Sequence, residues 1–171
     1  TMDAEQLLNT YDERQLRNIF REFGDIENAG RLAKSIVNAR EISSIRSIAE
    51  LKEAIASCIP KGKEFQYLAK VFQALRIEIN GEIEALKQLL EQSVEVLKPG
   101  GRMVVIAYHS LEDRLVKNFF RTGNFEGEAE KDFYGNLLRP MEPVNRKPVT
   151  PGEEELNENN RARSAKLRIA E

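Results

Sequence analysis

The side chains best suited to chemistry are His109 and Ser110, which follow directly on the longest apolar run of the sequence, residues 103–108. Ligands of open α/β sheets bind beyond the carboxyl ends of the strands, where a histidine and a serine can hold them by hydrogen bonds. A polar pair that ends a buried strand is also costly unless it has a use. We therefore predict that His109 and Ser110 face a catalytic or substrate-binding cleft.

A structural interpretation of the same segment stays open. Ser110 is a favourable N-cap for a helix that follows, and Glu112 and Asp113 would then lie in the first turn of that helix. Acids in a first turn are favoured by the helix dipole alone. The sequence does not decide between the two roles for Glu112 and Asp113, whereas the functional interpretation is preferred for His109 and Ser110.

A basic cluster follows the acidic stretch 153–158 near the C-terminus and contains Arg161, Arg163, Lys166 and Arg168. The net charge of -2 argues against a protein that coats nucleic acid non-specifically, but a local basic patch can still bind RNA. We predict that Arg161 and Arg163, in the loop before a strand, neutralise RNA phosphates, and we group Lys166 with them. Alternatively, Lys166 and Arg168 form the solvent face of an edge strand, which is the role expected for Arg168.

Several classes of site and protein are excluded or disfavoured by composition. One histidine and one cysteine, Cys58, cannot build a zinc site or a disulfide framework, so no metal site is predicted. Cys58 lies in an apolar helical pattern, and we expect a buried thiol. No apolar run approaches the roughly 20 residues that span a bilayer, and no signal peptide is visible. We expect a cytoplasmic protein with no membrane partner.

The first sixty residues have the pattern of short helices. Asp12 is a plausible N-cap for a helix that Gly24 closes, a second helix covers about 27–40, and Ser47 begins a third with a capping box. The breaker Pro-Lys-Gly-Lys at 60–63 then interrupts the pattern. We place a domain boundary there, between residues 62 and 63.

The second part predicts an α/β arrangement that remains rich in helix. Helices are expected over 65–80 and 82–97, then a strand at 102–108 after a Pro-Gly-Gly turn. An apolar strand without alternation is typical of one buried on both faces of a parallel α/β sheet. Residues 164–170 alternate and predict a half-buried strand near a sheet edge. Phe133 and Tyr134 lie in a polar loop, where they are candidates for stacking on a base.

Three stretches resemble one known family. They are FQALRI at 72–77, KPGGRMVVIAYHSLEDR at 98–114 and NRARSAKLR at 160–168, joined by LNTY at 8–11 and IFREFG at 19–24. Together they resemble the bacterial family that uses S-adenosylmethionine to methylate the exocyclic amine of a cytosine in 16S ribosomal RNA. The resemblance runs from end to end of the chain.

The resemblance implies a helical RNA-recognition (insertion) domain at 1–62, followed at 63–171 by the C-terminal part of a class I, Rossmann-like methyltransferase sheet. The partner would be 16S ribosomal RNA or the small ribosomal subunit, and His109 would bind the cytosine or handle a proton. Such enzymes hold S-adenosylmethionine with a glycine-rich turn after a strand. The pair Gly100-Gly101 precedes its strand instead. We therefore expect no cofactor-binding residue in this chain, a cofactor half that is missing from it, and no activity of the chain alone.

By the same resemblance the strand at 102–108 is central, with 164–170 on one side and a neighbour outside this chain on the other. An open apolar strand edge is a template for association, so we expect the chain alone to form a dimer. The main alternative function is a non-catalytic RNA- or protein-binding helical module. A purely helical interaction protein is disfavoured by the strand at 102–108.

Overall fold

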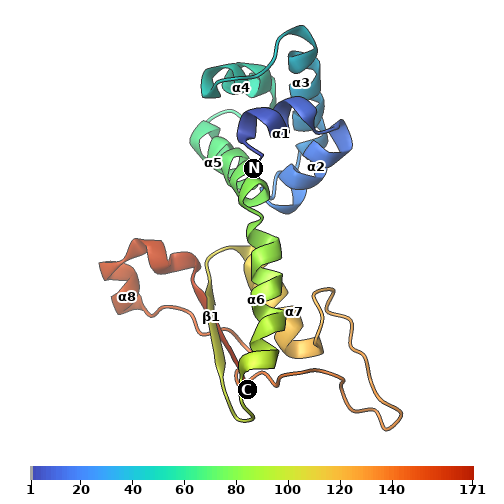
Figure 1. Cartoon of the computed structure of the whole chain (residues 1–171). Coiled ribbons are helices and arrows are strands. Elements are labelled where there is room, and N and C mark those ends of the chain that lie inside the picture. Colours follow the sequence, from blue (N-terminus) through green and yellow to red (C-terminus); the bar gives the residue numbers. More distant parts are fainter. Residues whose placement is uncertain (1) are drawn as a thin grey trace. The chain divides into compact units, whose positions relative to one another are not determined.

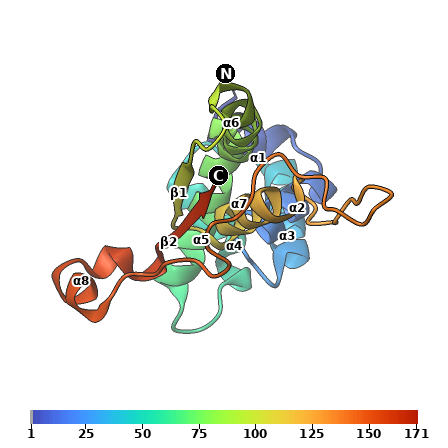
Figure 2. The same cartoon turned by 90° about the horizontal axis from the view of Figure 1, so that it is seen from below.

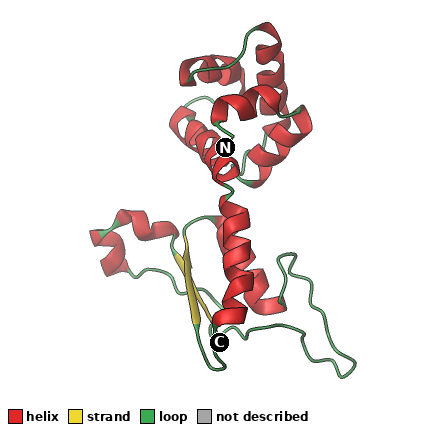
Figure 3. Cartoon of the chain, viewed as in Figure 1, coloured by secondary structure: helices red, strands yellow, loops and turns green. Residues whose placement is uncertain are grey.

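The computed structural model describes residues 2–171 and has a helix-rich α/β fold (Figure 1). Two compact units make up the chain, and they divide between Glu82 and Ile83. Helices dominate the first unit, whereas the second also holds the two strands of the described chain (Figure 3). Within the described residues no helix is both long and apolar enough to cross a membrane.

The first unit is a cluster of helices whose starts are set by side-chain caps. Asp12 and Ser47 each accept a hydrogen bond from the backbone three residues on, and a glutamine or glutamate at that position caps in return. This confirms the helix starts predicted at both residues. The helices are α1 (Ala4–Thr10), α2 (Glu13–Glu22), α3 (Ala29–Ile42), α4 (Ile48–Ile55), a short 3-10 turn η1 (Ala56–Cys58) and α5 (Glu64–Asn80).

Helix α5 belongs to the first unit because its apolar face completes that unit's core. Tyr67, Leu68, Val71 and Leu75 are buried in one cluster with residues of α2 and α3 such as Phe20. The unit therefore ends at Glu82, beyond the boundary that we expected between residues 62 and 63. The breaker at 60–63 turns the chain but does not separate two cores, because α5 returns to the core of the preceding helices. Cys58 is buried in this core, as expected.

The second unit contains one antiparallel strand pair and the helices that cover it. Its elements are α6 (Glu82–Val96, whose first residue belongs to the first unit), β1 (Met103–Ala107), α7 (Ser110–Thr122), α8 (Glu153–Glu158), a 3-10 helix η2 (Asn160–Ser164) and β2 (Lys166–Ala170). Met103 lies opposite Ala170, and Ala107 lies opposite Lys166. Both predicted strands are confirmed. The parallel sheet that we expected is not found among the described residues, since β1 and β2 run antiparallel.

Only one face of this strand pair is covered. Leu90 of α6 and Val116, Phe119 and Phe120 of α7 form a core with Ala170. On the opposite face the side chains of Val104 and Ile106 are 56% and 53% exposed. The expectation of a strand buried on both faces is therefore wrong for the described chain, because its helices pack on a single face.

The two edges of the pair also differ. The segment 142–149 runs along the outer edge of β2, with Val144 N–H donating to the carbonyl of Ile169 at 2.9 Å. The side chain of Asn145, the next residue, makes the hydrogen bond that a strand backbone would make, since its Oδ1 accepts from Ile169 N–H at 2.8 Å. The other edge of β1 has no strand partner among the described residues. The dimer expected from that open edge stays a prediction.

Candidate functional site

His109 and Ser110 lie where the end of β1 meets the start of α7. His109 is the N-cap of α7, and its Nδ1 accepts a hydrogen bond from Leu111 N–H at 3.3 Å. The side chain of Glu112 reaches back and accepts from His109 N–H at 3.2 Å. The capping box is therefore centred on His109, and the alternative in which Ser110 caps the helix is wrong.

The cap contact determines which proton the imidazole of His109 can offer. A neutral imidazole whose Nδ1 accepts a hydrogen bond carries its proton on Nε2. In the neutral ring Nε2–H is thus the donor, and the half-buried side chain lies at the end of β1. Ser110 is exposed at the first position of α7, next to this ring. The structure thus brings the two predicted residues together at one strand end.

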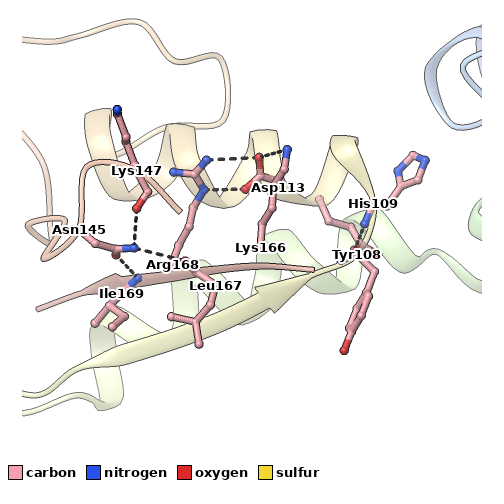
Figure 4. A network of polar contacts seen from close by, with 10 residues as sticks. Tyr108, His109, Asp113, Asn145, Lys147, Lys166, Leu167, Arg168 and Ile169 are labelled. Atoms are coloured by element: carbon pink, nitrogen blue, oxygen red, sulfur yellow. Dashed lines mark hydrogen bonds and ion pairs between the residues drawn. The ribbon is translucent and has the colours of Figure 1, made fainter. Parts of the chain in front are cut away.

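The two acids after Ser110 have separate structural roles. Glu112 accepts from the backbone N–H groups of Tyr108 and His109, so it holds the strand end against the first turn of the helix. Asp113 is buried and turns toward β2, where it meets two cations (Figure 4). The structural interpretation is the one that the contacts of both acids support.

Asp113, Lys166 and Arg168 form one ion cluster between α7 and β2, in which Asp113 and Arg168 are buried and Lys166 is partly exposed (Figure 4). Arg168 donates from Nε to Asp113 Oδ1 at 2.7 Å and from Nη2 to Oδ2 at 3.3 Å. Lys166 Nζ lies 3.2 Å from Asp113 Oδ2. The expectation that Arg168 points to solvent is therefore wrong, because α7 covers its face of β2 and supplies the counter-charge.

The electrostatics of the cluster favour the ionised carboxylate. Burial raises the pKa of Asp113, but the hydrogen bonds and charges of Arg168 and Lys166 outweigh this effect. The pKa of Asp113 consequently lies below its ordinary value. Lys166 remains partly exposed, with its ammonium already engaged by this carboxylate. Its contact with RNA phosphates stays a prediction, and such a contact would share the lysine with Asp113.

Arg161 and Arg163 lie on the surface in η2, a 3-10 helix rather than the loop that we expected. Both side chains are exposed, and the described residues provide neither with an ion pair. Helix α8, which carries acidic residues in its first turn, precedes η2 in sequence and lies beside it. The role of Arg161 and Arg163 in binding RNA stays a prediction.

A second basic site was not found by sequence reasoning. A cavity of about 430 Å³ opens between α7, the loop that follows it and β2, and it is lined by five cationic side chains and no acid. Lys117 and Arg121 could have been noticed, because they lie four residues apart on the polar face of α7. Arg146 comes from an irregular loop and carries no such signal.

The described residues include no group of three or more histidine, cysteine, aspartate or glutamate side chains that could hold a metal ion.

Comparison of the sequence with known families gives a match to the MraW methylase family over residues 1–171. The chain belongs to the MraW methylase family.

Similar proteins with a curated description carry the name ribosomal RNA small subunit methyltransferase H. The protein of Bacteroides thetaiotaomicron is 55% identical over 99% of this chain, and that of Amoebophilus asiaticus is 53% identical over all of it. The protein of Flavobacterium johnsoniae is 50% identical over 99% of the chain. The alignments cover 55–56% of these relatives, so the chain spans about half the length of the curated relatives that it matches.

Methylases of this kind are expected to use S-adenosylmethionine, which class I enzymes hold close to a glycine-rich turn. A glycine-rich turn would have to follow a strand so that the backbone approaches the cofactor. In this member of the MraW methylase family His109 and Ser110 follow β1, whereas Gly100 and Gly101 precede it. The residues that follow β1 are thus polar side chains rather than glycines.

Proposed function

We propose that this chain is part of an S-adenosylmethionine-dependent methyltransferase that modifies the exocyclic amine of a cytosine in 16S ribosomal RNA. The observation that carries the proposal is the family match over the whole chain, together with the names of relatives that are 50–55% identical. In this proposal the chain supplies the C-terminal part of a class I sheet and the helical unit that recognises RNA. S-adenosylmethionine binds to the remainder of the longer protein, and this chain alone does not catalyse methyl transfer.

A methylation assay of the longer gene product tests this proposal. Small ribosomal subunits from cells that lack the gene would be incubated with the protein and tritiated S-adenosylmethionine, and the RNA would then be digested to nucleosides. We expect label in a cytidine methylated on its exocyclic amine. Label on another base, or RNA binding without any methyl transfer, would instead favour the non-catalytic binding module.

Within this function His109 and Ser110 face the target base. An enzyme that modifies a base takes it out of the stack and reads its Watson–Crick edge by hydrogen bonds. Cytosine offers a ring nitrogen and a carbonyl oxygen there as acceptors, and the Nε2–H of His109 is a donor at the end of β1. His109 is thus assigned to holding the base rather than to removing its proton. The Ser110 hydroxyl can donate to or accept from the same base.

Changing His109 to asparagine in the longer protein separates this role from helix capping. The asparagine Oδ1 can accept from Leu111 N–H as Nδ1 does now, and asparagine is a favoured N-cap, so stability should be retained. The donor at Nε2 is lost, and kcat/KM for small subunits should fall by about 2- to 10-fold, as expected for a hydrogen bond between neutral groups of about 0.5–1.5 kcal/mol. Steady-state kinetics measures the fall in kcat/KM, and thermal unfolding measures whether stability is retained. Unchanged kinetics at unchanged stability would remove His109 from the base-binding site.

Replacing Arg161 and Arg163 together by alanine tests the exposed arginines of η2. In the longer protein the double variant should use RNA substrate less well while its affinity for S-adenosylmethionine stays the same. Each phosphate that is no longer bound should also flatten the log–log dependence of RNA binding on salt by about one unit. The control is Lys98→Ala with Arg102→Ala, which removes two cations at the opposite end of β1, one of them paired with Glu171. If both double variants methylate small subunits normally at physiological salt, the arginines are solvated surface only.

A further inference from the structure

The basic cavity beside α7 concentrates positive charge that the protein does not neutralise. Lys117 and Arg121 come from α7, Arg139 and Arg146 come from the loop that follows it, and Arg168 comes from β2. Two of the five are used internally, since Arg139 contacts Glu142 at 2.8 Å and Arg168 contacts Asp113 at 2.7 Å. The remaining three, Lys117, Arg121 and Arg146, are exposed and form no ion pair within the described residues. A polyanion is the ligand that such a site favours.

Next to the basic cavity lies a loop with two aromatic side chains at its tip, and Leu137 of this loop lines the cavity. Residues 131–137 form a narrow turn, with an antiparallel bridge between Lys131 and Leu137 and a hydrogen bond from Leu138 N–H to the carbonyl of Glu130 at 2.9 Å. We call this segment the finger loop. It belongs to the stretch after α7 that extends away from the helices of the second unit (Figure 2).

Asp132 fixes the tip of the finger loop. Its carboxylate accepts from the backbone N–H groups of Tyr134 and Asn136, each at 2.8 Å, and from the Asn136 side chain at 2.9 Å. Gly135, with φ of 87°, closes the turn by donating to the carbonyl of Asp132. The backbone at the tip is therefore held by its own hydrogen bonds and needs no core contact from the aromatic rings.

Phe133 and Tyr134 project from this tip into solvent. Phe133 is 98% exposed and Tyr134 is 86% exposed, and the two rings contact only edge to face at a centroid distance of 5.6 Å. Exposed aromatic rings on such a turn present flat apolar surface, and each ring has only two side-chain torsions to order on binding. Every nucleobase has a face that can stack on such a ring, and each stack contributes about 1–3 kcal/mol to single-stranded nucleic acid binding.

We propose that the finger loop and the basic cavity form one binding surface for single-stranded RNA. Phe133 and Tyr134 stack on an unpaired base, while Lys117, Arg121 and Arg146 hold the phosphates of neighbouring nucleotides. The two parts are continuous, because Leu137 at the base of the finger loop and Arg121 both line the cavity. A duplex does not fit this surface, since its bases are stacked on each other and unavailable to the rings. The choice of RNA over another polyanion rests on the function proposed above.

The test is binding of the 171-residue chain to a fluorescein-labelled single-stranded RNA of about 12 nucleotides, followed by anisotropy over a series of salt concentrations. Phe133→Ala with Tyr134→Ala should weaken binding by about fivefold or more at every salt concentration and leave the salt slope unchanged. Arg121→Ala with Arg146→Ala should reduce the slope by roughly 0.7 for each phosphate that is no longer neutralised. The matched controls are Phe65→Ala, an equally exposed phenylalanine of α5, and Lys98→Ala with Arg102→Ala. Both controls should bind as the original chain does.

Three further measurements decide the chemistry. An RNA of the same length with abasic positions should bind the original chain and the aromatic variant equally, since no base is left to stack. Tyr134→Phe should bind as the original does, because the ring is retained. Competition by polyglutamate as effective as competition by RNA, or no RNA binding by the original chain, would overturn the proposal. If the longer protein methylates cytosine while the aromatic and the arginine double variants bind RNA as well as the original chain, the proposed binding surface is overturned and the proposed function stands. If RNA binding depends on these residues but the longer protein methylates no cytosine, the binding surface is supported and the methyltransferase function is rejected.

Discussion

Changing Asp113 to asparagine is expected to lower the free energy of unfolding of the second unit by about 3–5 kcal/mol, the usual cost of breaking a buried ion pair by removing one partner. The reason is the guanidinium of Arg168, which is almost fully buried and has two of its nitrogens bonded to that carboxylate. An asparagine keeps the size of the side chain but removes the charge. Urea unfolding followed by hydrogen exchange of residues in α7 and β2 measures the change.

The control replaces both buried partners at once. Asp113→Leu with Arg168→Met removes the two charges together and keeps apolar volume, and such exchanges are often neutral or stabilising. The double variant should therefore be more stable than the Asp113→Asn single variant. Lys166, partly exposed and 3.2 Å from the carboxylate, should return to solvent in either case. A single variant within about 1 kcal/mol of the original chain would show that water or Lys166 already compensates Arg168.

The sign of the pH dependence follows from the lowered pKa of Asp113. The folded state favours the ionised carboxylate, so its contribution to stability is present at pH values above the unfolded pKa, which lies near 3.8. That contribution is lost as the pH falls below this value and through the folded pKa. The original chain should thus lose more stability than Asp113→Asn between neutral and acid pH, and the two curves should converge at the acid end.

Local signals in the sequence are sufficient to predict the elements. Asp12 and Ser47 begin helices because a short oxygen-bearing side chain followed three residues later by glutamine or glutamate satisfies both ends of a capping box. Gly81 ends α5 in the left-handed conformation, with φ of 60°, which glycine adopts without strain. Both strands lie within one residue or two of the segments predicted for them, because each apolar pattern is bounded by turns.

The sequence could not show which neighbour covers each face. Lys166 and Arg168 alternate with apolar residues. The alternation shows that the basic and the apolar side chains point to opposite faces of the strand, but it does not show which face is exposed to solvent. The answer depends on α7, whose Asp113 lies more than fifty residues away in the sequence. For the same reason the apolar run of β1 predicts burial on both sides, although Val104 and Ile106 are about half exposed.

Candidate sites are predictable only where one segment holds all their parts. His109 and Ser110 can be found because a strand end and a helix start are adjacent in sequence. The basic cavity cannot, since its walls come from α7 and from an irregular loop of which Arg146 is part. The finger loop is expected only as a polar loop, because the hydrogen bonds of Asp132 that order it span four residues without regular periodicity.

Cutting the chain after residue 62 is expected to leave an unfolded peptide, whereas residues 1–82 should fold cooperatively. Leu68, Val71 and Leu75 of α5 are buried in the core of the first unit and are each worth about 1.5–3 kcal/mol there. Their loss together is on the order of the whole stability of a small domain, about 5–15 kcal/mol. The shorter peptide also exposes the apolar faces of α1 and α2 that α5 covers.

Circular dichroism during thermal unfolding and the spread of amide proton resonances distinguish the two pieces. The piece 1–82 should give a sigmoidal transition and dispersed resonances, and the piece 1–62 should give neither. A matched control carries Leu68→Asp and Val71→Asp in the longer piece, which keeps its length but puts charge into the core and should behave like the short one. A short piece that unfolds cooperatively would restore the boundary at residues 62 and 63. The expected result instead places the boundary where buried contacts end, because a turn in the chain separates domains only when the segment after it packs elsewhere.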